Sequence, residues 1–534
     1  MAEQLFFSRD SKLYLELDGT VWEIPILDGF SFSQATNQTE ISLSEMQGSD
    51  GLSRRGNRLF TDSLAPAEFS FSSYVRPYET NSEHGAVEEA LWAVMAGADK
   101  YKAASAGGGI ATISDQTSAQ SGNLGGITDG TYTINDEDTT GGSGSAGVGW
   151  ELDVVIASNA VSSITVVSAG SGFSATNTIT ITGANLQTSK AGQTGGSGTL
   201  HLRVDSVTTT GASFYRGSQA DENSSFGPAV VEPSGTSSII NFGQSNRSTL
   251  GTCNLFFVME TAQDTPMVYK LSNAAVNEAS IDFEVDGIAT INWSGFAKTI
   301  TDMQSAGDVT VNTSAAATSG GTAAAGKVHI RKSGGASPML FSFYPTANTP
   351  VTAIRTGVDS TSTFIRNRLT QLLVEDKDAD TTAFPSTNYS LTLTGGNITI
   401  SNNISYLVPE ELGAVNVPIE HVTGGRTASG SFNCYLTLET DSGNNGTSVE
   451  LFNDMTNSAT GGGLSKVVNN FEVTFQIGGS VGTPRLNVTM PKVHINVPSH
   501  SIEDVISVET SFGAYTDDFN VANEVQLEYI GPAI

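Results

Sequence analysis

The chain has 534 residues, enough for several domains, and its formal net charge is −30 because 55 acidic side chains outnumber 25 basic ones. This balance provides no overall basic surface for holding nucleic acid by its phosphates. Only 15% of the residues are charged and 57 are glycine, while short alternating runs of Val, Ile, Thr, Phe and Tyr dominate. The pattern predicts an all-β protein of many short strands with a minor helical part.

The N-terminal sequence and the cysteines indicate where the chain is made. No apolar run typical of a signal peptide or a membrane span follows the opening MAEQLFFSRDSK. Cys253 and Cys434 stand in strand-like sequence and are expected to be buried, reduced thiols, because secreted β proteins more often carry paired cysteines. We therefore expect assembly in a reducing cytoplasm without membrane insertion.

One β-rich unit occurs twice along the chain. The first copy begins near Phe30 with FSFSQATNQ, and the second begins near Ile398 with ITISNNISY. Each copy continues into a strand, AEFSFSSYV at Ala67–Val75 and ASGSFNCYL at Ala428–Leu436. A short helical pattern follows in both, with Leu91, Trp92 and Met95 matching Leu451, Phe452 and Met455. Repetition of a sheet-forming unit predicts a symmetric assembly with fewer subunits than sectors.

Composition shifts divide the chain further. The first unit is expected at 1–104 and 208–304, with a short helix at Glu88–Gly97. A Gly-rich segment with two alternating strands at 105–207 predicts a small β domain inserted into that unit. Residues 305–337 are mostly rich in Ala, Gly, Ser and Thr and predict a linker, and the second unit spans 338–534.

The sequence contains no recognisable catalytic or metal-binding motif. The six histidines are scattered, without the cysteine or paired acid at ligand spacing that a metal site needs. The nucleophile, zincin and phosphate-loop motifs do not occur. We therefore expect neither an enzyme nor a cofactor or metal. A polysaccharide-degrading enzyme would need two carboxylates across a cleft, and although acids are plentiful, nothing singles out such a pair.

One acidic run alternates with apolar residues at Ile281–Asp286. In a strand, Asp282, Glu284 and Asp286 would share one face, and three neighbouring carboxylates require good hydration. That face would be either the outer surface of a sandwich or the wall of a water-filled channel, and the pattern alone does not decide between them.

A basic cluster lies in Gly51–Phe60, where Arg54, Arg55 and Arg58 form the densest group of cations in an acidic chain. A nucleic-acid patch is one interpretation, but aromatic interleaving is almost absent. Pairing with acids of a neighbouring subunit is the interpretation we favour.

Several segments together resemble a tail tube protein of the long-tailed bacteriophages. They are IPILDGFSFSQATNQTEISLSE, SRRGNRLFTDSLAPAEFSFSSYVRPY and NEASIDFEVDGIATINWSGFAK, within 1–104 and 241–300. The second unit, with LTLTGGNITISNNISYLVPEELGAVNVPIEHVTGGRTASGSFNCYL, resembles the family more loosely. The resemblance implies two tandem β-sandwich or barrel domains, with six such domains closing a barrel in each ring. Two domains per chain then imply trimeric, pseudo-hexameric rings.

The resemblance also implies a role and partners. Stacked rings would form the virion tail tube through which viral DNA passes without specific binding, and other tail proteins (terminator, baseplate or tip, tape measure) would bind the tube. A surrounding sheath is left open. Asp282, Glu284 and Asp286 would line the lumen. The segment Gln38–Pro66 would stack rings, so Arg54, Arg55 and Arg58 would be inter-ring contacts. The corresponding stretch of the second unit, Ile404–Ala428, carries Glu410, Glu411 and Glu420 instead, so unlike charges would meet between the two arms.

The inserted domain carries the alternative function. It is expected to face outward, because an insertion into the lumen would block DNA. A β-rich adhesin or glycan-binding module would use its aromatics Tyr132, Trp150 and Phe173, if exposed, to stack on sugars, although core packing is the role we favour for each.

Overall fold

The structure is a computed structural model of the full chain. It describes residues 11–40, 59–80, 83–102, 109–116, 124, 127–144, 147–158, 160–171, 173, 176–188, 198–207, 213–221, 224–242, 250–259, 267–303, 329–330, 341–342, 361–377, 388–408, 417–437, 446–452, 455, 471–496, 499–502, 506–516 and 523–533.

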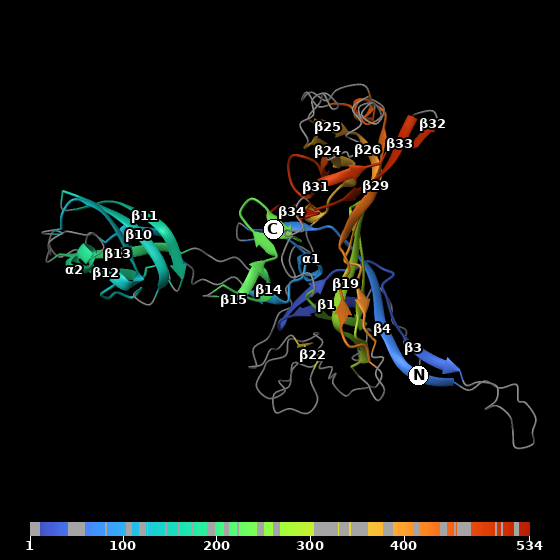
Figure 1. The fold of residues 1–534 in the computed structure, drawn as a ribbon, viewed down its shortest axis with the longest axis horizontal. Coiled ribbons are helices and arrows are strands. Elements are labelled where there is room, and N and C mark those ends of the chain that lie inside the picture. The colour runs from blue at the N-terminus through green and yellow to red at the C-terminus, as the bar shows by residue number, and fades with distance from the viewer. Residues whose placement is uncertain are drawn as a thin grey trace, which may run out of the picture. The chain divides into compact units, whose positions relative to one another are not determined.

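The chain divides into two compact units (Figure 1). The first contains Met1–Tyr101 and Ser213–Ile534, and the second is Lys102–Ala212. The range 105–207 predicted as an insertion lies within the second unit. The two predicted tube units lie within the first, except that residues 102–104 and 208–212 belong to the second. Strands dominate both units and the helices are short, so the all-β prediction is confirmed. Of the predicted linker 305–337, the structure describes only residues 329–330.

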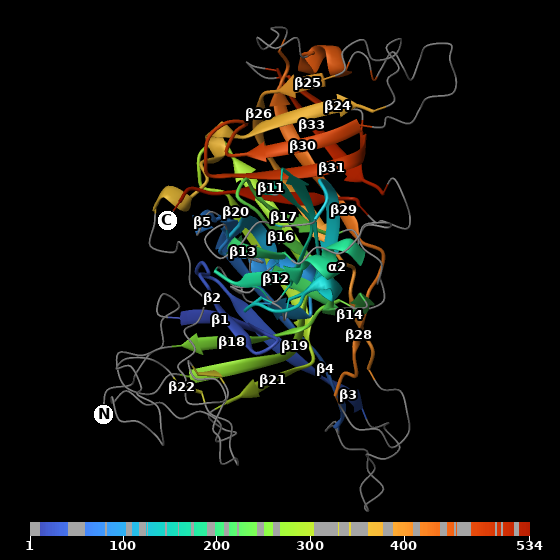
Figure 2. The ribbon, with the colours of Figure 1, turned by 90° about the vertical axis from the view of Figure 1, so that its left-hand side faces the viewer.

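The first repeat is built from two strand layers that share β19 (Met267–Glu284). Its later half lies in a layer with the order β3-β4-β20-β19. Its earlier half lies in a layer with the order β2-β1-β18-β19-β21 (Figure 2). The other bounds are β1 Ser11–Leu17, β2 Thr20–Ile24, β3 Ser31–Glu40, β4 Leu59–Tyr74, β18 Cys253–Met259, β20 Thr290–Ala297 and β21 Thr299–Asp302.

The second repeat has the same two layers. One has the order β26-β29-β33, followed by β31 and β32, and the other has the order β25-β24-β30-β31-β34. The bounds are β24 Gln371–Asp376, β25 Asn388–Leu391, β26 Leu393–Ser401, β29 Thr427–Tyr435, β30 Phe471–Ile477, β31 Arg485–Ile495, β32 Ser499–Ile502, β33 Ile506–Ala514 and β34 Gln526–Ile530.

The paired registers fix which residues are equivalent in the two repeats. Phe32 pairs with Phe69 in the first repeat, as Ile398 pairs with Gly430 in the second. The structural counterpart of Ile398 is therefore Phe32, two residues later than the Phe30 that the sequence comparison suggested. A displacement of two residues leaves every side chain on the same face of a strand, which is why the alternating pattern could not reveal it.

The two repeats are joined into one sheet. The end of β19 pairs antiparallel with β26, from Glu278 opposite Ser401 to Glu284 opposite Gly395. We call the resulting sheet, with the order β3-β4-β20-β19-β26-β29-β33 and then β31 with β32, the polar-faced sheet. Its other face is apolar, so the name refers to the side turned away from the core.

The core forms because these strands alternate strictly. On β4, Phe69 and Phe71 are buried while the intervening positions are more exposed, and Ile291 and Trp293 repeat the pattern on β20. Burial of each such side chain contributes about 1.5–3 kcal/mol. One continuous cluster of buried residues extends through both repeats. At the join, the rings of Phe283 and Phe475 lie 5.6 Å apart.

Helix α1 (Glu89–Met95) lies in the first repeat at the predicted helix. Its Trp92 is fully buried and meets Trp293 edge to face at 4.6 Å between ring centroids. The indole Nε1 of Trp92 donates to the Tyr529 hydroxyl of β34 at 2.7 Å. A long-range hydrogen bond therefore connects the helix of the first repeat with the last strand of the chain.

Smaller elements complete the first unit. Strands β16 and β17 extend the edge of β34 through the pairing of β17 with β34. Cys253 and Cys434 are buried free thiols, as expected. The remaining bounds are β5 Pro77–Thr80, β6 Glu83–Ala86, β7 Lys100–Lys102, β14 Ser213–Asp221, β15 Ser224–Ala229, β16 Val231–Pro233, β17 Ser238–Asn241, β22 His329–Ile330, β23 Phe341–Ser342, β27 Ser405–Tyr406, β28 His421–Val422 and 3-10 helices at Thr361–Thr363 and Asn367–Leu369.

The second unit has its own core, formed by two three-stranded sheets with the orders β11-β10-β9 and β12-β13-β8. Tyr132, Trp150 and Phe173 are all buried in it, which confirms core packing as their role and removes them as an exposed platform for sugars. The bounds are β8 Ile110–Asp115, β9 Gly130–Asn135, β10 Val148–Ala157, β11 Ala160–Ser171, β12 Thr178–Thr182, α2 Gly183–Thr188, β13 Thr199–Val207 and a 3-10 helix at Asp136–Asp138.

A search of the described helices finds none that is both long and apolar enough to cross a bilayer.

Candidate functional sites: a polar sheet face and a buried carboxylate pocket

Short polar side chains cover the outward face of the polar-faced sheet. Because side chains alternate along each strand, the register places those of neighbouring strands in rows. One row follows the paired positions Ser72, Asn292, Ser280, Thr399 and Ser429 across five strands. Hydroxyl and amide groups therefore continue across the join between the repeats without interruption.

Hydrogen bonds tie these rows together. The Ser72 hydroxyl donates to the Asn292 amide oxygen at 2.6 Å, and the Asn292 amide donates to Asp282 Oδ2 at 2.5 Å. Ser280 donates to Asp282 Oδ1 at 3.3 Å and accepts from the Thr399 hydroxyl at 3.2 Å. A chain of contacts thus extends from β4 to β26 and fixes the orientation of the Asp282 carboxylate.

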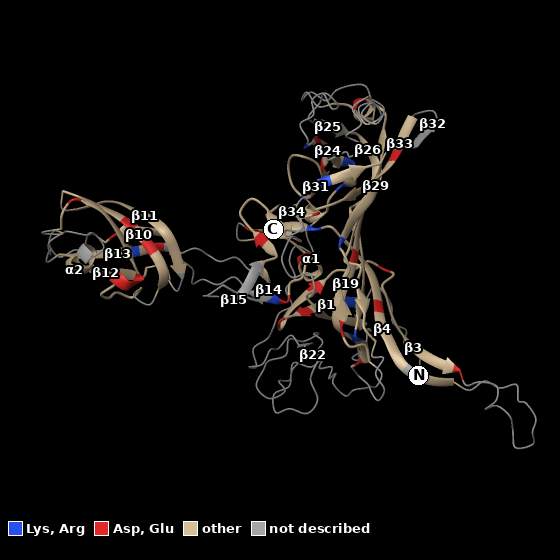
Figure 3. Ribbon diagram, in the orientation of Figure 1, with Lys and Arg blue, Asp and Glu red and all other residues tan. Residues whose placement is uncertain are grey.

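The charged side chains of this face are acids. Among the described strand residues that point away from the core on β4, β20, β26, β29, β33 and the part of β19 within this sheet (275–284), none is Lys or Arg. Figure 3 shows acidic positions along β4. The acids of this face are Glu68, Glu278, Asp282, Glu284 and Glu509. The face therefore combines negative charge with neutral hydrogen-bonding groups.

The structure brings together two of the three predicted lumen residues. Asp282 and Glu284 lie on the polar side of β19, where burial raises the pKa of Asp282 above its usual value. β19 ends at Glu284, and Asp286 lies in the turn that follows. There Asp286 pairs with Arg368 at 2.9 Å, and both side chains are largely exposed. The glycine that follows Asp286 explains why the alternation stops.

The predicted inter-ring residues lie mostly beyond what is described. Arg54, Arg55, Arg58, Glu410 and Glu411 fall outside the described residues. Glu420 is exposed, and its backbone oxygen accepts from the Leu407 N–H at 2.9 Å.

The predicted arm is described up to its outer end. β3 and β4 remain paired as far as Glu40 opposite Leu59, although β4 pairs with β20 only from Ala67 onward. The two strands therefore form a ribbon that extends past the sheet (Figure 1). Leu59 and Phe60 are 57% and 63% exposed on this ribbon, which gives it an apolar outer part that the sequence analysis did not identify.

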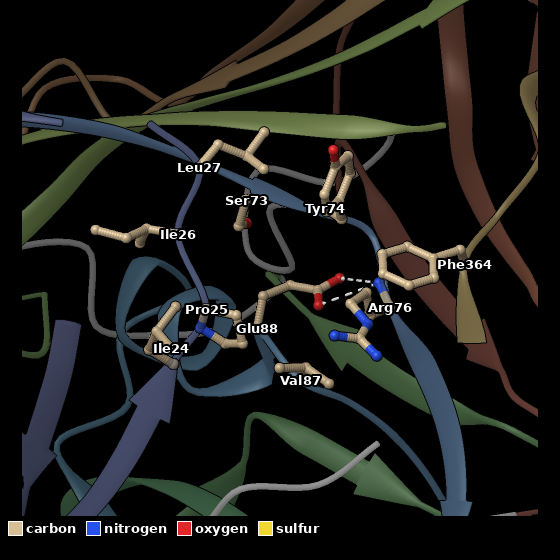
Figure 4. Close-up of a pocket in the computed structure, with 10 residues that line it drawn as sticks. All are labelled: Ile24, Pro25, Ile26, Leu27, Ser73, Tyr74, Arg76, Val87, Glu88 and Phe364. Atoms are coloured by element: carbon tan, nitrogen blue, oxygen red, sulfur yellow. Dashed lines mark hydrogen bonds between the residues drawn. The ribbon is translucent and has the colours of Figure 1, made fainter. Parts of the chain in front are cut away.

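A small pocket of about 160 Å³ lies beside α1 (Figure 4). Its walls are mainly apolar, and the Glu88 carboxylate reaches into it, where both oxygens accept from the Arg76 backbone N–H at 3.2 and 3.3 Å. The Arg76 guanidinium packs 4.3 Å from the centroid of the Phe364 ring. The lining residues are Ile24, Pro25, Ile26, Leu27, Ser73, Tyr74, Arg76, Val87, Glu88 and Phe364.

Two adjacent carboxylates at the start of α1 are withdrawn from solvent, with Glu88 buried and Glu89 half-buried. Burial raises the pKa of Glu88 to about 7, against the opposing hydrogen bonds from Tyr529 and Arg76. Burial also raises the pKa of Glu89 to about 7, and repulsion from Glu88 adds to the shift while a hydrogen bond from Ser238 opposes it. The pair therefore titrates near neutrality, whereas ordinary carboxylates are fully ionised there.

Sequence reasoning missed these features for different reasons. The serines and asparagines of the polar face were visible in the alternation of AEFSFSSY and TINWSGF, but only strand order shows that they form rows. Glu88 and Glu89 stand where acids normally favour an exposed helix start. Their burial depends on Tyr529 and Ser238, which are remote in sequence and gave no local signal.

Known proteins offer one informative comparison. No protein-family model matches the chain. The sequence is 30% identical over 168 residues to tail tube protein pb6 of Escherichia phage T5. The match covers 31% of this chain and 32% of that protein, so the chain spans about a third of the length of the curated relative it matches. Among the described residues, no group of three or more His, Cys, Asp or Glu side chains is placed to hold a metal ion. Over that shared third, the chain is similar to a structural protein of a phage tail tube.

Proposed function

We propose that this chain is a structural virion protein of the duplicated tube-domain type, without enzymatic activity, whose rings stack into a phage tail tube. The observation that carries the proposal is the polar-faced sheet, in which two equivalent four-strand units are joined edge to edge. The similarity to tail tube protein pb6 supports the same role independently of the structure.

The ring follows from the internal join. Within one chain, the sheet of the first repeat continues into the second because β19 pairs with β26. If the edge strands of neighbouring copies pair in the same way, the sheet closes around the ring and leaves no exposed edge. With six tube domains in a ring, three chains complete it, so the ring is threefold outside and nearly sixfold inside.

The polar face suits the wall of a DNA channel. Its charged groups are Glu68, Glu278, Asp282, Glu284 and Glu509, which repel a polyanion over about one Debye length, roughly 8 Å at physiological salt. A basic wall would release counterions from DNA and retain it. Serine, threonine and asparagine keep the wall hydrated. DNA then passes through the tube without being held.

The ribbon of β3 and β4 is placed to contact the next ring. It extends past the sheet, and Leu59 and Phe60 are exposed on it. An apolar contact would add to the charge pairing proposed for Arg54, Arg55, Arg58, Glu410, Glu411 and Glu420. Other tail proteins would cap the tube ends, the assembled protein would reside in the virion tail, and the second unit would face away from the lumen.

Electron microscopy of the purified full-length protein, followed by DNA binding to the particles, tests this function. We expect hollow rings or tubes that do not retain double-stranded DNA at low salt. The variant Glu68→Lys with Glu284→Lys places cations on the polar face, so its particles should bind DNA and release it as salt rises. The control Asp99→Lys with Glu232→Lys makes the same change in net charge at exposed positions outside that face.

The two variants separate a channel wall from a simple charge effect. Salt-sensitive DNA binding by the wall variant alone supports the proposal. Equal binding by both variants, or by neither, would contradict the assignment of the polar face to the lumen. Dispersed monomers at high protein concentration would contradict the tube itself.

A further inference from the structure

The polar-faced sheet has two open edges in the isolated chain. Among the described residues, β3 pairs only with β4, and β32 pairs only with β33. An unpaired edge presents a row of backbone N–H and C=O groups that readily accepts another strand. Its two ends therefore expose one edge from the first repeat and one from the second.

The join inside the chain shows how such edges fit. There β19, the edge strand of the first repeat in this sheet, pairs with β26, the edge strand of the second repeat. The open edge of the second repeat, β31 with β32, is equivalent to β19, because Phe512 pairs with Ile495 as Gly295 pairs with Val276. The open strand β3 is equivalent to β26. Each open edge thus has the same place in its repeat as one side of the internal join.

Both edge strands also carry the same irregularity. In β19, one extra residue falls between the pairs of Val276 and Glu278, and this residue is Asn277. In the second repeat, one extra residue falls between Ile495 and Ser499, and Asn496 directly follows Ile495. An extra residue in the same interval of both repeats means that the two edge strands keep equivalent pairings on either side of it.

The bulge asparagine holds the internal join. Asn277 Oδ1 accepts the backbone N–H of Ile404, just beyond β26, at 2.7 Å. The exposed Asn496 donates its amide Nδ2 to the Ser511 hydroxyl at 2.7 Å, which orients the side chain. Its Oδ1 is the atom equivalent to the one that holds Ile404.

We propose that β3 of one copy pairs antiparallel with β32 and the end of β31 of a second copy, in the register of the internal join. Asp282 opposite Asn397 translates into Ser501 opposite Ser31, and Ser280 opposite Thr399 translates into Ser499 opposite Ser33. Asn496 Oδ1 of the copy that supplies β32 accepts a backbone N–H from the copy that supplies β3, just beyond the paired residues, as Asn277 Oδ1 accepts from Ile404 within the chain. The inference rests on the proposed tube function and specifies the contact that closes its ring.

Paired cysteine substitutions in the full-length protein test this register. The in-register variants are Ser31→Cys with Ser501→Cys, and Ser33→Cys with Ser499→Cys. Directly opposite residues of antiparallel strands have Cα atoms about 4.5–5.5 Å apart, within the range of a disulfide. The crossed variants Ser31→Cys with Ser499→Cys, and Ser33→Cys with Ser501→Cys, use the same four positions but are displaced by two residues, beyond about 7 Å.

Oxidation followed by non-reducing electrophoresis gives the readout. We expect the in-register variants to form linked dimers and trimers, and the crossed variants and the wild type to remain monomeric on the gel. Linkage of a crossed variant would overturn the register. Rings in the microscope without linkage of any variant would overturn edge pairing while leaving the tube intact. Absence of both rings and linkage would instead reject the proposed function and this inference with it.

Asn496 provides a second, milder test. Asn496→Asp keeps an acceptor oxygen that the Ser511 hydroxyl can still orient, so ring formation should match that of the wild type. Asn496→Leu removes the acceptor, and loss of one hydrogen bond should weaken association about fivefold, as measured by the concentration at which rings dissociate. Equal association of both variants would overturn the role of Asn496.

Discussion

The first and second repeats share a strand order but start their helices in opposite ways. In the first repeat, α1 begins beside the buried Glu88 and the half-buried Glu89, and no side chain caps it. In the second, helical residues 448–452 follow a capping box, in which Glu450 Oε2 accepts from the Thr447 N–H at 2.7 Å and Thr447 Oγ1 accepts from the Glu450 N–H at 3.2 Å. The second arrangement keeps its acid exposed.

This difference follows from what covers each helix. The last strand of the chain, β34, packs against α1, where Tyr529 contacts both Trp92 and Glu88. The contact between α1 and β34 is therefore buried, and burial raises the pKa of its Glu88 carboxylate to about 7. A duplicated backbone thus supports two different electrostatic environments, and substitutions at matched positions of the two repeats can separate them.

The largest effect is expected from Trp92→Ala. It removes a buried ring packed against Trp293 and the hydrogen bond to Tyr529, at a cost of about 4 kcal/mol in the free energy of unfolding. Phe452→Ala, the matched change in the second repeat, should cost less because it breaks no such hydrogen bond to the last strand. Urea unfolding measures both, and a larger loss for Phe452→Ala would contradict the special role of the contact between α1 and β34.

Glu88→Gln should change how stability depends on pH. The folded-state pKa of Glu88 is raised from 4.5 to about 7 by burial, so the folded protein binds more protons than the unfolded chain between these values. The contribution of Glu88 to the free energy of unfolding is fully present below pH 4.5 and is lost as pH rises through 7. The loss is roughly 3 kcal/mol at most. The variant should be more stable than the wild type at pH 8, with a flatter profile between pH 5 and 8.

The matched control is Glu450→Gln in the second repeat. Its exposed side chain can still accept from the Thr447 N–H after the change, so the variant should match the wild type in stability at pH 8. Thermal unfolding across pH 5–8 compares the two variants. If Glu88→Gln shows the same slope as the wild type, the buried carboxylate does not titrate in this range.

Thr447→Ala removes the hydroxyl of the capping box and should cost about 1 kcal/mol. The exposed Thr427 of β29 offers a comparison at which the same substitution should change stability by less than about 0.5 kcal/mol. Urea midpoints measure both variants. Equal midpoints would show that the helix of the second repeat does not depend on its cap.

The smallest effect is expected at the exposed ion pair between the repeats. Asp286 and Arg368 are 86% and 74% exposed, so solvent and salt screen their attraction. Asp286→Asn should change the free energy of unfolding by less than about 0.5 kcal/mol in 150 mM salt. A loss above 1.5 kcal/mol would show that this turn contributes substantially to joining the repeats.

Local sequence patterns predicted the strands, the short helix and the repeat, because alternation and helical spacing are local properties of the chain. They located Asp282 and Glu284 on a common polar strand face. They failed at Asp286, where the turn ended the alternation. The rows of serines and asparagines depend on the order of strands that are far apart in the chain, such as β4 beside β20, and this order is set by the shared core.

The central claim is that copies continue one another's sheets around a channel lined by the polar face. Electron cryomicroscopy of assembled full-length protein tests it most directly. We expect three copies per ring, β3 of each copy paired with β32 of its neighbour, and Asp282 and Glu284 facing the bore. A ring in which these two side chains face outward, or in which β3 remains unpaired, would contradict it.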